Sequence, residues 1–132
     1  MKKIWRGSHT KHRLQVHIVW ISKYRKRVLR GKIALQLKHL LYEACKMNQW
    51  WIEEIKIMDD HVHMMIQIKP TESVAEVVQI FKGGTSRAIR KEHPELEEFL
   101  WGDSFWADGY FAETVGQVEE EVVKRYIREQ RK

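Results

Sequence analysis

The sequence predicts an α+β fold of the ferredoxin-like, split βαβ type: an antiparallel sheet with helices on one face and a C-terminal helix that carries Tyr126. Two observations predict it. Segments with apolar residues at every second position alternate with segments of helical periodicity, in the order β-α-β-β-α-β-α. The chain has 132 residues, a length that suits one domain, and we expect that domain to span residues 1–132.

The first strand is expected over residues 12–22, where alternate side chains are apolar: Leu14, Val16, Ile18 and Trp20. A basic stretch follows at residues 23–27. Apolar residues then recur at helical spacing over residues 33–47, which predicts a helix.

A hairpin is expected next. Residues 51–58 are rich in β-branched side chains, and Asp59-Asp60 favours a turn. Residues 61–69 alternate until Pro70 ends the strand. A second helix begins near Val74. Gly83-Gly84 is a candidate kink or end point, and the helical pattern resumes until His93-Pro94.

The last two elements are a strand and a helix. Residues 101–115 are rich in aromatic side chains and contain two glycines, so we expect one strand there, with a bulge or a short preceding loop. The final helix is expected over about residues 117–130. Its acidic residues lie in the first turn and its basic residues towards the end, which suits the helix dipole.

Charge and composition narrow the choice of partner and compartment. With 24 Lys and Arg against 18 Asp and Glu, the net charge of +6 favours polyanionic partners, although charge alone does not identify one. The single cysteine, Cys45, excludes an intramolecular disulfide. No apolar segment is long enough to span a bilayer. We therefore expect a soluble, cytoplasmic protein with no membrane partner, associated with the nucleoid when bound to DNA.

His61-Val62-His63 is a candidate metal-binding pair. Strand alternation places His61, His63, Met65 and Gln67 on one face and Val62, Met64, Ile66 and Ile68 on the other. The apolar set is expected to meet the helices, so both imidazoles stand on the opposite, open face, spaced to share one metal ion. Two ligands are too few, so a third ligand is required. The alternative is a surface pair that serves solubility or cross-strand packing.

Tyr126 and Gln130 lie four residues apart, on one face of the final helix. A phenol is a suitable nucleophile for phosphoryl transfer when a divalent metal ion polarises the phosphate. The alternative is that Tyr126 extends the apolar stripe of the helix, which contains Val122, Val123 and Ile127. Tyr110 is the main rival nucleophile.

These segments, in this order, resemble the TnpA family of insertion-sequence transposases, the single-tyrosine group of the HUH endonucleases. The matching stretches cover most of residues 17–130: HIVWISKYR at 17–25, MDDHVH at 58–63, FKG at 81–83 with Ser86-Arg87, FWADGYF at 105–111, and YIREQ at 126–130.

The resemblance implies that His61, His63 and Gln130 bind a divalent cation, Mg²⁺ or Mn²⁺. It implies that Tyr126 attacks single-stranded DNA, giving a 5′-phosphotyrosine and a free 3′-hydroxyl that allow later rejoining. It also implies hairpins near the element ends as the DNA target, and a homodimer in which the tyrosine helix of one chain can serve the other. His17 matches a family position and is expected near the metal.

Phosphate contacts are expected from four basic residues, for which a solvated basic surface is the alternative: Lys23, Arg25, Lys82 and Arg87. Two other functions stay open. One is a non-catalytic ferredoxin-like nucleic-acid-binding domain. The other is a replication-initiator or relaxase-type HUH nickase, although the short length of the chain argues against it. The base that accepts the phenol proton is not identified by the sequence.

Overall fold

The computed structural model of the chain describes residues 13–115 and 120–130. Its four strands form one antiparallel sheet in the order β2-β3-β1-β4. The strands are β1 (Leu14–Ile21), β2 (Trp51–Ile57), β3 (His61–Ile68) and β4 (Phe111–Thr114). The predicted antiparallel sheet of the split βαβ plan is therefore confirmed.

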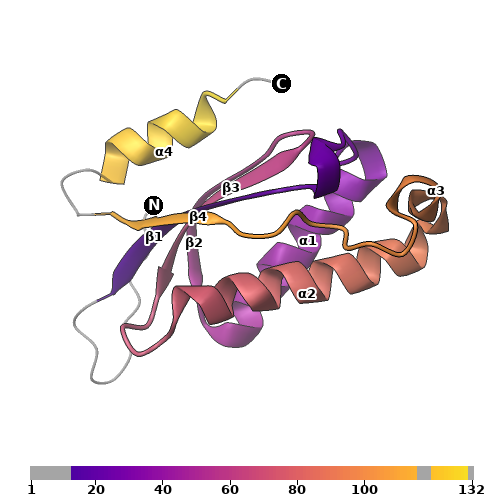
Figure 1. Ribbon diagram of the computed structural model, residues 1–132. Helices are drawn as coiled ribbons and strands as arrows, with labels where there is room; N and C mark the ends of the chain where they lie inside the picture. The colour runs from indigo at the N-terminus through magenta and orange to yellow at the C-terminus, as the bar shows by residue number, and fades with distance from the viewer. Residues whose placement is uncertain (1–12, 116–119, 131–132) are drawn as a thin grey trace.

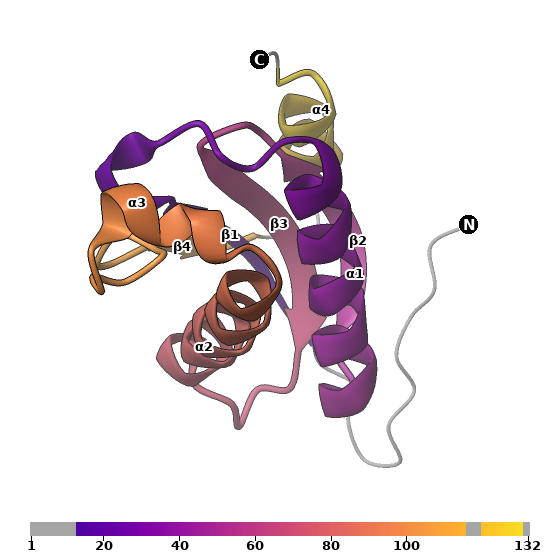
Figure 2. The ribbon, with the colours of Figure 1, turned by 90° about the vertical axis from the view of Figure 1, so that its right-hand side faces the viewer.

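Two long helices, α1 (Gly31–Asn48) and α2 (Val74–Glu92), cover one face of this sheet, as Figures 1 and 2 show. The main hydrophobic core lies between these two helices and the sheet. Alternation along β1 and β3 directs their apolar side chains to this layer, where they are buried with residues of both helices: Val16, Ile18, Trp20, Val62, Met64, Ile66, Ile68, Leu37, Leu41, Val77, Phe81 and Ile89. Full burial of one such side chain contributes about 1.5–3 kcal/mol.

The second helix runs unbroken through Gly83 and Gly84. Each glycine inside a helix costs about 0.5–1 kcal/mol relative to alanine. Packing outweighs that cost, because Val77, Phe81 and Ile89 on both sides of the glycine pair are buried in the same core. The sequence pattern had left a kink or an end at this point open.

The expected strand over residues 101–115 is wrong for most of its length. A 3₁₀ turn η2 (Pro94–Leu96) and a short helix α3 (Glu97–Leu100) precede a loop, and strand β4 begins only at Phe111. Trp101, Gly102 and Gly109 all have positive φ, which interrupts an extended chain. The loop is anchored by an isolated bridge between Ser22 and Trp106 and by burial of Trp106 in the main core.

The C-terminal helix α4 (Glu120–Arg128) lies across the opposite face of the sheet, against β2 and β3 (Figure 1). Ile127 is fully buried there with Met65 and Val115. Residues 117–119 of the predicted helix lie outside the described residues, and Gln130 lies just beyond the end of α4. Within the described part of the chain, no helix is long and apolar enough to cross a membrane.

Candidate metal and tyrosine site

The histidine pair lies on β3 and faces α4, away from α1 and α2, as strand alternation requires. The expectation that this face is open is wrong, because α4 covers it. Only 4% of the surface of His63 is exposed. Contacts between residues far apart in the sequence, Ile127 with Met65 and Val115, hold α4 over the sheet.

His17 lies beside His63 on the same face. Their rings stack with centroids 5.6 Å apart and an angle of 13° between planes, and His17 Nε2 is 3.4 Å from His63 Nδ1. On the other side, His17 Nδ1 is 3.3 Å from Glu113 Oε2, its cross-strand neighbour on β4. When the His17 Nδ1–H donates to Glu113, Nε2 can accept the Nδ1–H of His63. His63 then keeps Nε2 for a metal ion.

The pKa of His63 is lowered from 6.5 to about 4, chiefly by burial and then by the nearby charges of His61 and His17. A hydrogen bond that His63 donates to the side chain of Gln130 acts in the opposite direction. His63 is therefore neutral at neutral pH, which is the form that binds metal ions.

His61 has a carboxylate of its own. Its Nδ1 is 2.6 Å from Asp60 Oδ1, and Arg25 Nε is 3.4 Å from the other oxygen of the same carboxylate. Burial raises the pKa of Asp60, but the hydrogen bond and charge of His61, together with Arg25, outweigh it and hold that pKa below its usual value. An Nδ1–H that donates to Asp60 leaves Nε2 of His61 free as a ligand.

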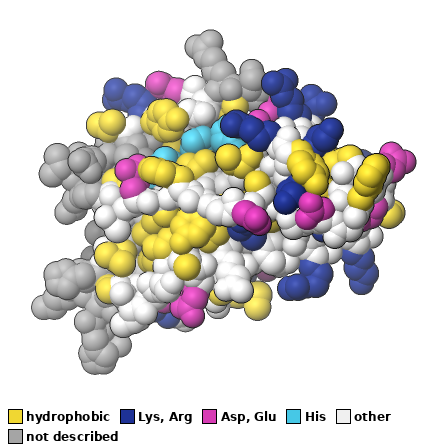
Figure 3. Space-filling model, viewed as in Figure 1, with side chains coloured by type: hydrophobic (Ala, Val, Ile, Leu, Met, Phe, Trp, Pro, Cys, Tyr) yellow, Lys and Arg dark blue, Asp and Glu magenta, His cyan; other side chains and the backbone are white. Residues whose placement is uncertain are grey.

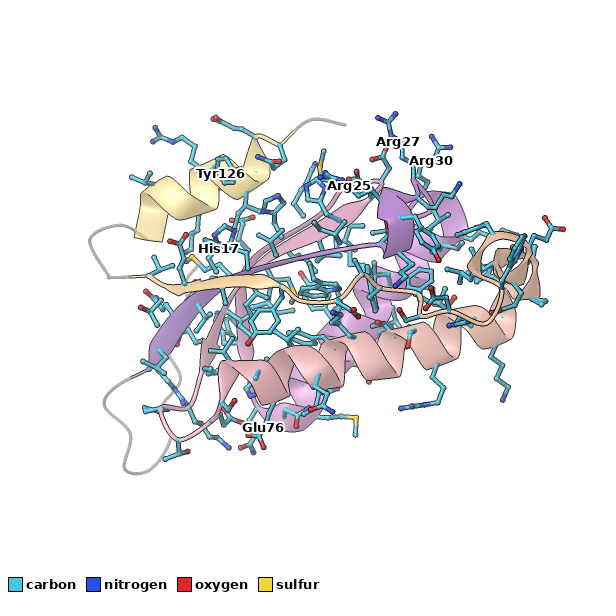
Figure 4. The ribbon with its side chains drawn as sticks, in the orientation of Figure 1. His17, Arg25, Arg27, Arg30, Glu76 and Tyr126 are labelled. Atoms are coloured by element: carbon cyan, nitrogen blue, oxygen red, sulfur yellow. The ribbon has the colours of Figure 1, made fainter. Side chains whose placement is uncertain are left out.

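The ring of Tyr126 lies against the rings of His63 and His17. Its ring centroid is 5.7 Å from that of His63 and 6.4 Å from that of His17, edge to face in each case. Figure 4 shows Tyr126 on α4 and His17 on β1 across from it. Tyr126 is 53% exposed, whereas its neighbour Ile127 is fully buried. The tyrosine therefore does not share the buried position of Ile127 and has room for a ligand.

The structure thus brings together every residue expected at the metal and tyrosine site: His17, His61, His63, Tyr126 and Gln130. In Figure 3 the histidine side chains reach the surface between hydrophobic and basic ones. Among residues 13–115 and 120–130, no group of three or more His, Cys, Asp or Glu side chains could hold a metal ion. Two imidazoles and the Gln130 amide nonetheless fit a divalent cation that keeps coordination positions open for phosphate oxygens.

The four expected DNA contacts are divided between two parts of the molecule. Lys23 and Arg25 lie on η1 (Lys23–Arg25), which follows the end of β1. Lys23 pairs there with Asp103, and Arg25 pairs with Asp60. Lys82 and Arg87 lie on α2, on the other side of the sheet. Lys82 Nζ donates to the carbonyl oxygens of Ala107 and Gly109, at 2.7 and 3.1 Å, so this lysine holds the loop that leads to β4.

Two site residues were missed in the sequence. Asp60 had been assigned only to a turn, yet a carboxylate directly before a candidate histidine ligand is a signal that could have identified it. Glu113 has no local signal, because it meets His17 only through the pairing of β4 with β1. Arg27 and Arg30 are exposed beside Arg25, and all three lie at the same end of the sheet in Figure 4.

Comparisons with known proteins agree with this geometry. Residues 10–130 match the family described as "Transposase IS200 like". The chain is 31% identical over 119 residues to the ISDra2 transposase TnpA of Deinococcus radiodurans, covering 90% of this chain and 85% of the relative. It is 28% identical over 123 residues to the transposase for insertion sequence element IS200 of Salmonella typhimurium, covering 93% and 80%.

Two solved structures are also similar. A crystal structure assigned as a transposase from Deinococcus radiodurans R1 superimposes with a TM-score of 0.77 at 27% identity, covering 96% of this chain and 98% of the other. A REP-associated tyrosine transposase bound to a REP hairpin superimposes with a TM-score of 0.57 over 96% of this chain and 70% of the other. Its identity of 12% makes that second likeness one of fold alone.

Proposed function

The chain belongs to the family of IS200-like transposases, and on that premise we propose that it cleaves and rejoins single-stranded DNA with Tyr126 as the nucleophile. The observation that carries the proposal is the position of the Tyr126 ring, 5.7 Å from His63 and 6.4 Å from His17, on the face that also holds His61. A phenol, two imidazoles and an amide at one place suit phosphoryl transfer assisted by a divalent cation.

In the proposed reaction the Tyr126 hydroxyl oxygen attacks a backbone phosphorus atom. The bond from phosphorus to the 3′-oxygen breaks, the protein keeps a 5′-phosphotyrosine, and the net movement of one proton is from the phenol to the leaving 3′-oxygen. Attack by another 3′-hydroxyl reverses the step and restores the phenol. Because one phosphodiester is exchanged for another, rejoining requires no external source of energy.

His61, His63 and Gln130 are the proposed ligands of the cation, Mg²⁺ or Mn²⁺. When bound, the cation would polarise the phosphate and neutralise charge that develops on its oxygens. Asp60 orients His61 by holding its Nδ1, which the cation does not use. Glu113 holds Nδ1 of His17, and Nε2 of His17 in turn holds Nδ1 of His63, so Glu113 orients His63 through His17. The neutral state of His63 keeps the site ready for metal at neutral pH.

The basic loop after β1 is the proposed contact for DNA phosphates. Arg25, Arg27 and Arg30 are exposed beyond the end of β1, on the same upper side of the sheet as Tyr126 in Figure 4. Three guanidinium groups can bind phosphate oxygens without reading bases, so they would position a strand rather than select a sequence. Base-paired hairpins at the ends of the element are the proposed targets, and Lys23, Lys82 and Arg87 are proposed as further contacts.

We also propose a homodimer, because excision cuts two DNA ends and each chain supplies one such tyrosine. In a single chain, α4 rests on its own sheet and brings Tyr126 to its own histidines. Exchange of α4 between chains would place the tyrosine opposite the histidines of the neighbour. A mixture of Tyr126→Phe and His63→Ala chains tests this, because only exchange lets one chain's tyrosine meet intact histidines, and no activity in the mixture would contradict it.

The test of the function uses labelled single-stranded DNA that carries the hairpins flanking the coding sequence. With Mg²⁺ or Mn²⁺ we expect a covalent protein–DNA adduct that Tyr126→Phe and His63→Ala abolish. Tyr110→Phe is the matched control and should keep the adduct. Binding without an adduct in either metal would contradict the proposal and favour a non-catalytic nucleic-acid-binding domain.

A further inference from the structure

Phe111 is an exposed aromatic side chain beside the proposed site. It is 52% exposed at the start of β4, and its ring lies edge to face against His17 with centroids 6.0 Å apart. Glu113, two residues along the same strand, is the cross-strand partner of His17. Because side chains two residues apart share a face, Phe111 lies on the same face as Glu113 and the site histidines.

The pairing of the strands places Phe111 in line with the histidine pair. Val19 of β1 is the partner of Phe111 on one side and of His63 on the other. A row of side chains therefore crosses the sheet from β3 to β4 in the order His63, Val19, Phe111. Figure 3 shows hydrophobic side chains directly beside the histidine atoms that are visible on this face.

Phe111 and Tyr126 are both in contact with His17, from β4 and from α4 respectively. The Tyr126–His17 ring distance is 6.4 Å and the His17–Phe111 distance is 6.0 Å, so both rings border one small area of the surface.

We propose that Phe111 is a stacking platform for an unpaired DNA base adjacent to the phosphate that Tyr126 attacks. The inference rests on the proposed function and adds a binding contact to it. Single-stranded DNA offers base faces that are not covered by a partner strand, and a half-exposed phenyl ring matches them. Phe111 has no hydrogen-bonding group, so it accepts any base and fixes the position of the strand rather than its sequence.

Charge around the ring also favours DNA as the occupant. The exposed Arg25, Arg27 and Arg30 lie on the loop that follows β1, the strand that pairs with β4. An aromatic surface combined with basic side chains is the usual composition of a surface that binds single strands. Glu113, the carboxylate on the same strand, has its Oε2 3.3 Å from His17 Nδ1.

The test measures binding to an oligothymidylate of about 12 nucleotides, which is in the range that such surfaces accommodate. We expect Phe111→Ala to weaken binding about 5- to 150-fold, equivalent to about 1–3 kcal/mol, and Phe111→Trp to retain it. Tyr42→Ala is the matched control, because Tyr42 is 46% exposed on α1, on the other side of the sheet, and its loss should leave affinity unchanged. Unchanged affinity in Phe111→Ala would overturn the inference.

A second measurement identifies the contact directly and remains valid if Phe111→Ala fails to fold. Oligothymidylate with single 5-iodouracil substitutions is irradiated on the unaltered protein, and the cross-linked peptide is located by mass spectrometry. We expect cross-links at Phe111, and cross-links confined to other residues would overturn the platform. Binding needs no cleavage, so the two proposals can fail separately. Stacking at Phe111 without a covalent adduct contradicts the catalytic proposal alone. A covalent adduct without stacking at Phe111 contradicts the platform alone.

Discussion

The two faces of the sheet are held by different kinds of contact. Towards α1 and α2, large apolar side chains such as Trp20, Phe81 and Leu37 are fully buried in one continuous core. Towards α4, the buried apolar cluster of the described residues contains Met65, Val115 and Ile127.

Ion pairs supplement this small cluster. Lys124 Nζ is 3.0 Å from Glu53 Oε1, and Arg128 Nε is 3.2 Å from Glu54 Oε2. Ion pairs of this kind add little to stability once desolvation is counted. The comparison teaches that the face towards α1 and α2 supplies most of the stability of the domain. The other face holds the candidate site under a helix with a smaller buried apolar cluster among the described residues.

The largest expected effect is on the helical face. Phe81→Ala removes a fully buried ring that stacks on Trp20 with centroids 5.6 Å apart and meets Trp50 edge to face. We expect a loss of about 3–5 kcal/mol in the free energy of unfolding, because the cavity cannot refill. Urea titration followed by tryptophan fluorescence measures it. A loss of less than 1 kcal/mol would mean that this face is not the main source of stability.

A smaller global effect is expected from Ile127→Ala on the tyrosine face. An Ile→Ala change in a rigid core costs about 2–5 kcal/mol, but here α4 can detach before the rest unfolds, which limits the loss to the docking free energy. We expect faster amide exchange in α4, a reduced adduct yield and a midpoint shift below that of Phe81→Ala. Val122→Ala, at a position 70% exposed on the same helix, is the control. Equal midpoint shifts for Phe81→Ala and Ile127→Ala would break the distinction between the faces.

Asp60→Asn tests whether the tyrosine face is organised around metal ligands. Asparagine cannot hold the His61 Nδ1–H as a charged carboxylate does, so we expect Mn²⁺ affinity to fall about 10- to 100-fold with little change in stability. Titration calorimetry measures the affinity, and Asp59→Asn is the matched control. An unchanged Mn²⁺ affinity would contradict the role of Asp60 in orienting His61.

The smallest effect is expected from a change of one pH unit, which alters the stability contributed by a single titrating group by at most about 1.4 kcal/mol. The pKa of His63 is 6.5 in the unfolded chain and about 4 in the fold, chiefly because burial disfavours its charged form. Between these values the unfolded state holds more protons, so stability falls as pH decreases through this range. Melting temperatures measured across it should fall less steeply in His63→Gln than in the unaltered protein. Parallel curves would show that His63 does not contribute.

Local periodicity was enough to predict the elements whose faces are fixed by alternation or helical spacing. The direction in which His61 and His63 point follows from the two-residue repeat of β3. The prediction of a strand over the aromatic residues 101–115 was wrong because Phe105 and Trp106 enter the core from a loop, not from a strand. Aromatic content and alternation do not distinguish these two cases.

The site was predictable in its members but not in its surroundings. His61 and His63 share a strand, and Tyr126 and Gln130 are close in sequence, so their spacing made them candidates, and the family resemblance supplied their expected roles. The contact between His17 and Glu113 depends on strand pairing over 96 positions, and the cover provided by α4 depends on the packing of Ile127. Neither leaves a local pattern in the sequence.

The most direct test of the central claim is the identity of the residue that becomes joined to DNA. Single-stranded hairpin DNA is incubated with the unaltered chain and Mn²⁺, the protein is digested, and the nucleotide-bearing peptide is sequenced by mass spectrometry. We expect a phosphodiester on Tyr126 that disappears when Mn²⁺ is chelated. A modification on Tyr110 or Tyr24, or an adduct that forms equally well without a divalent cation, would contradict the account.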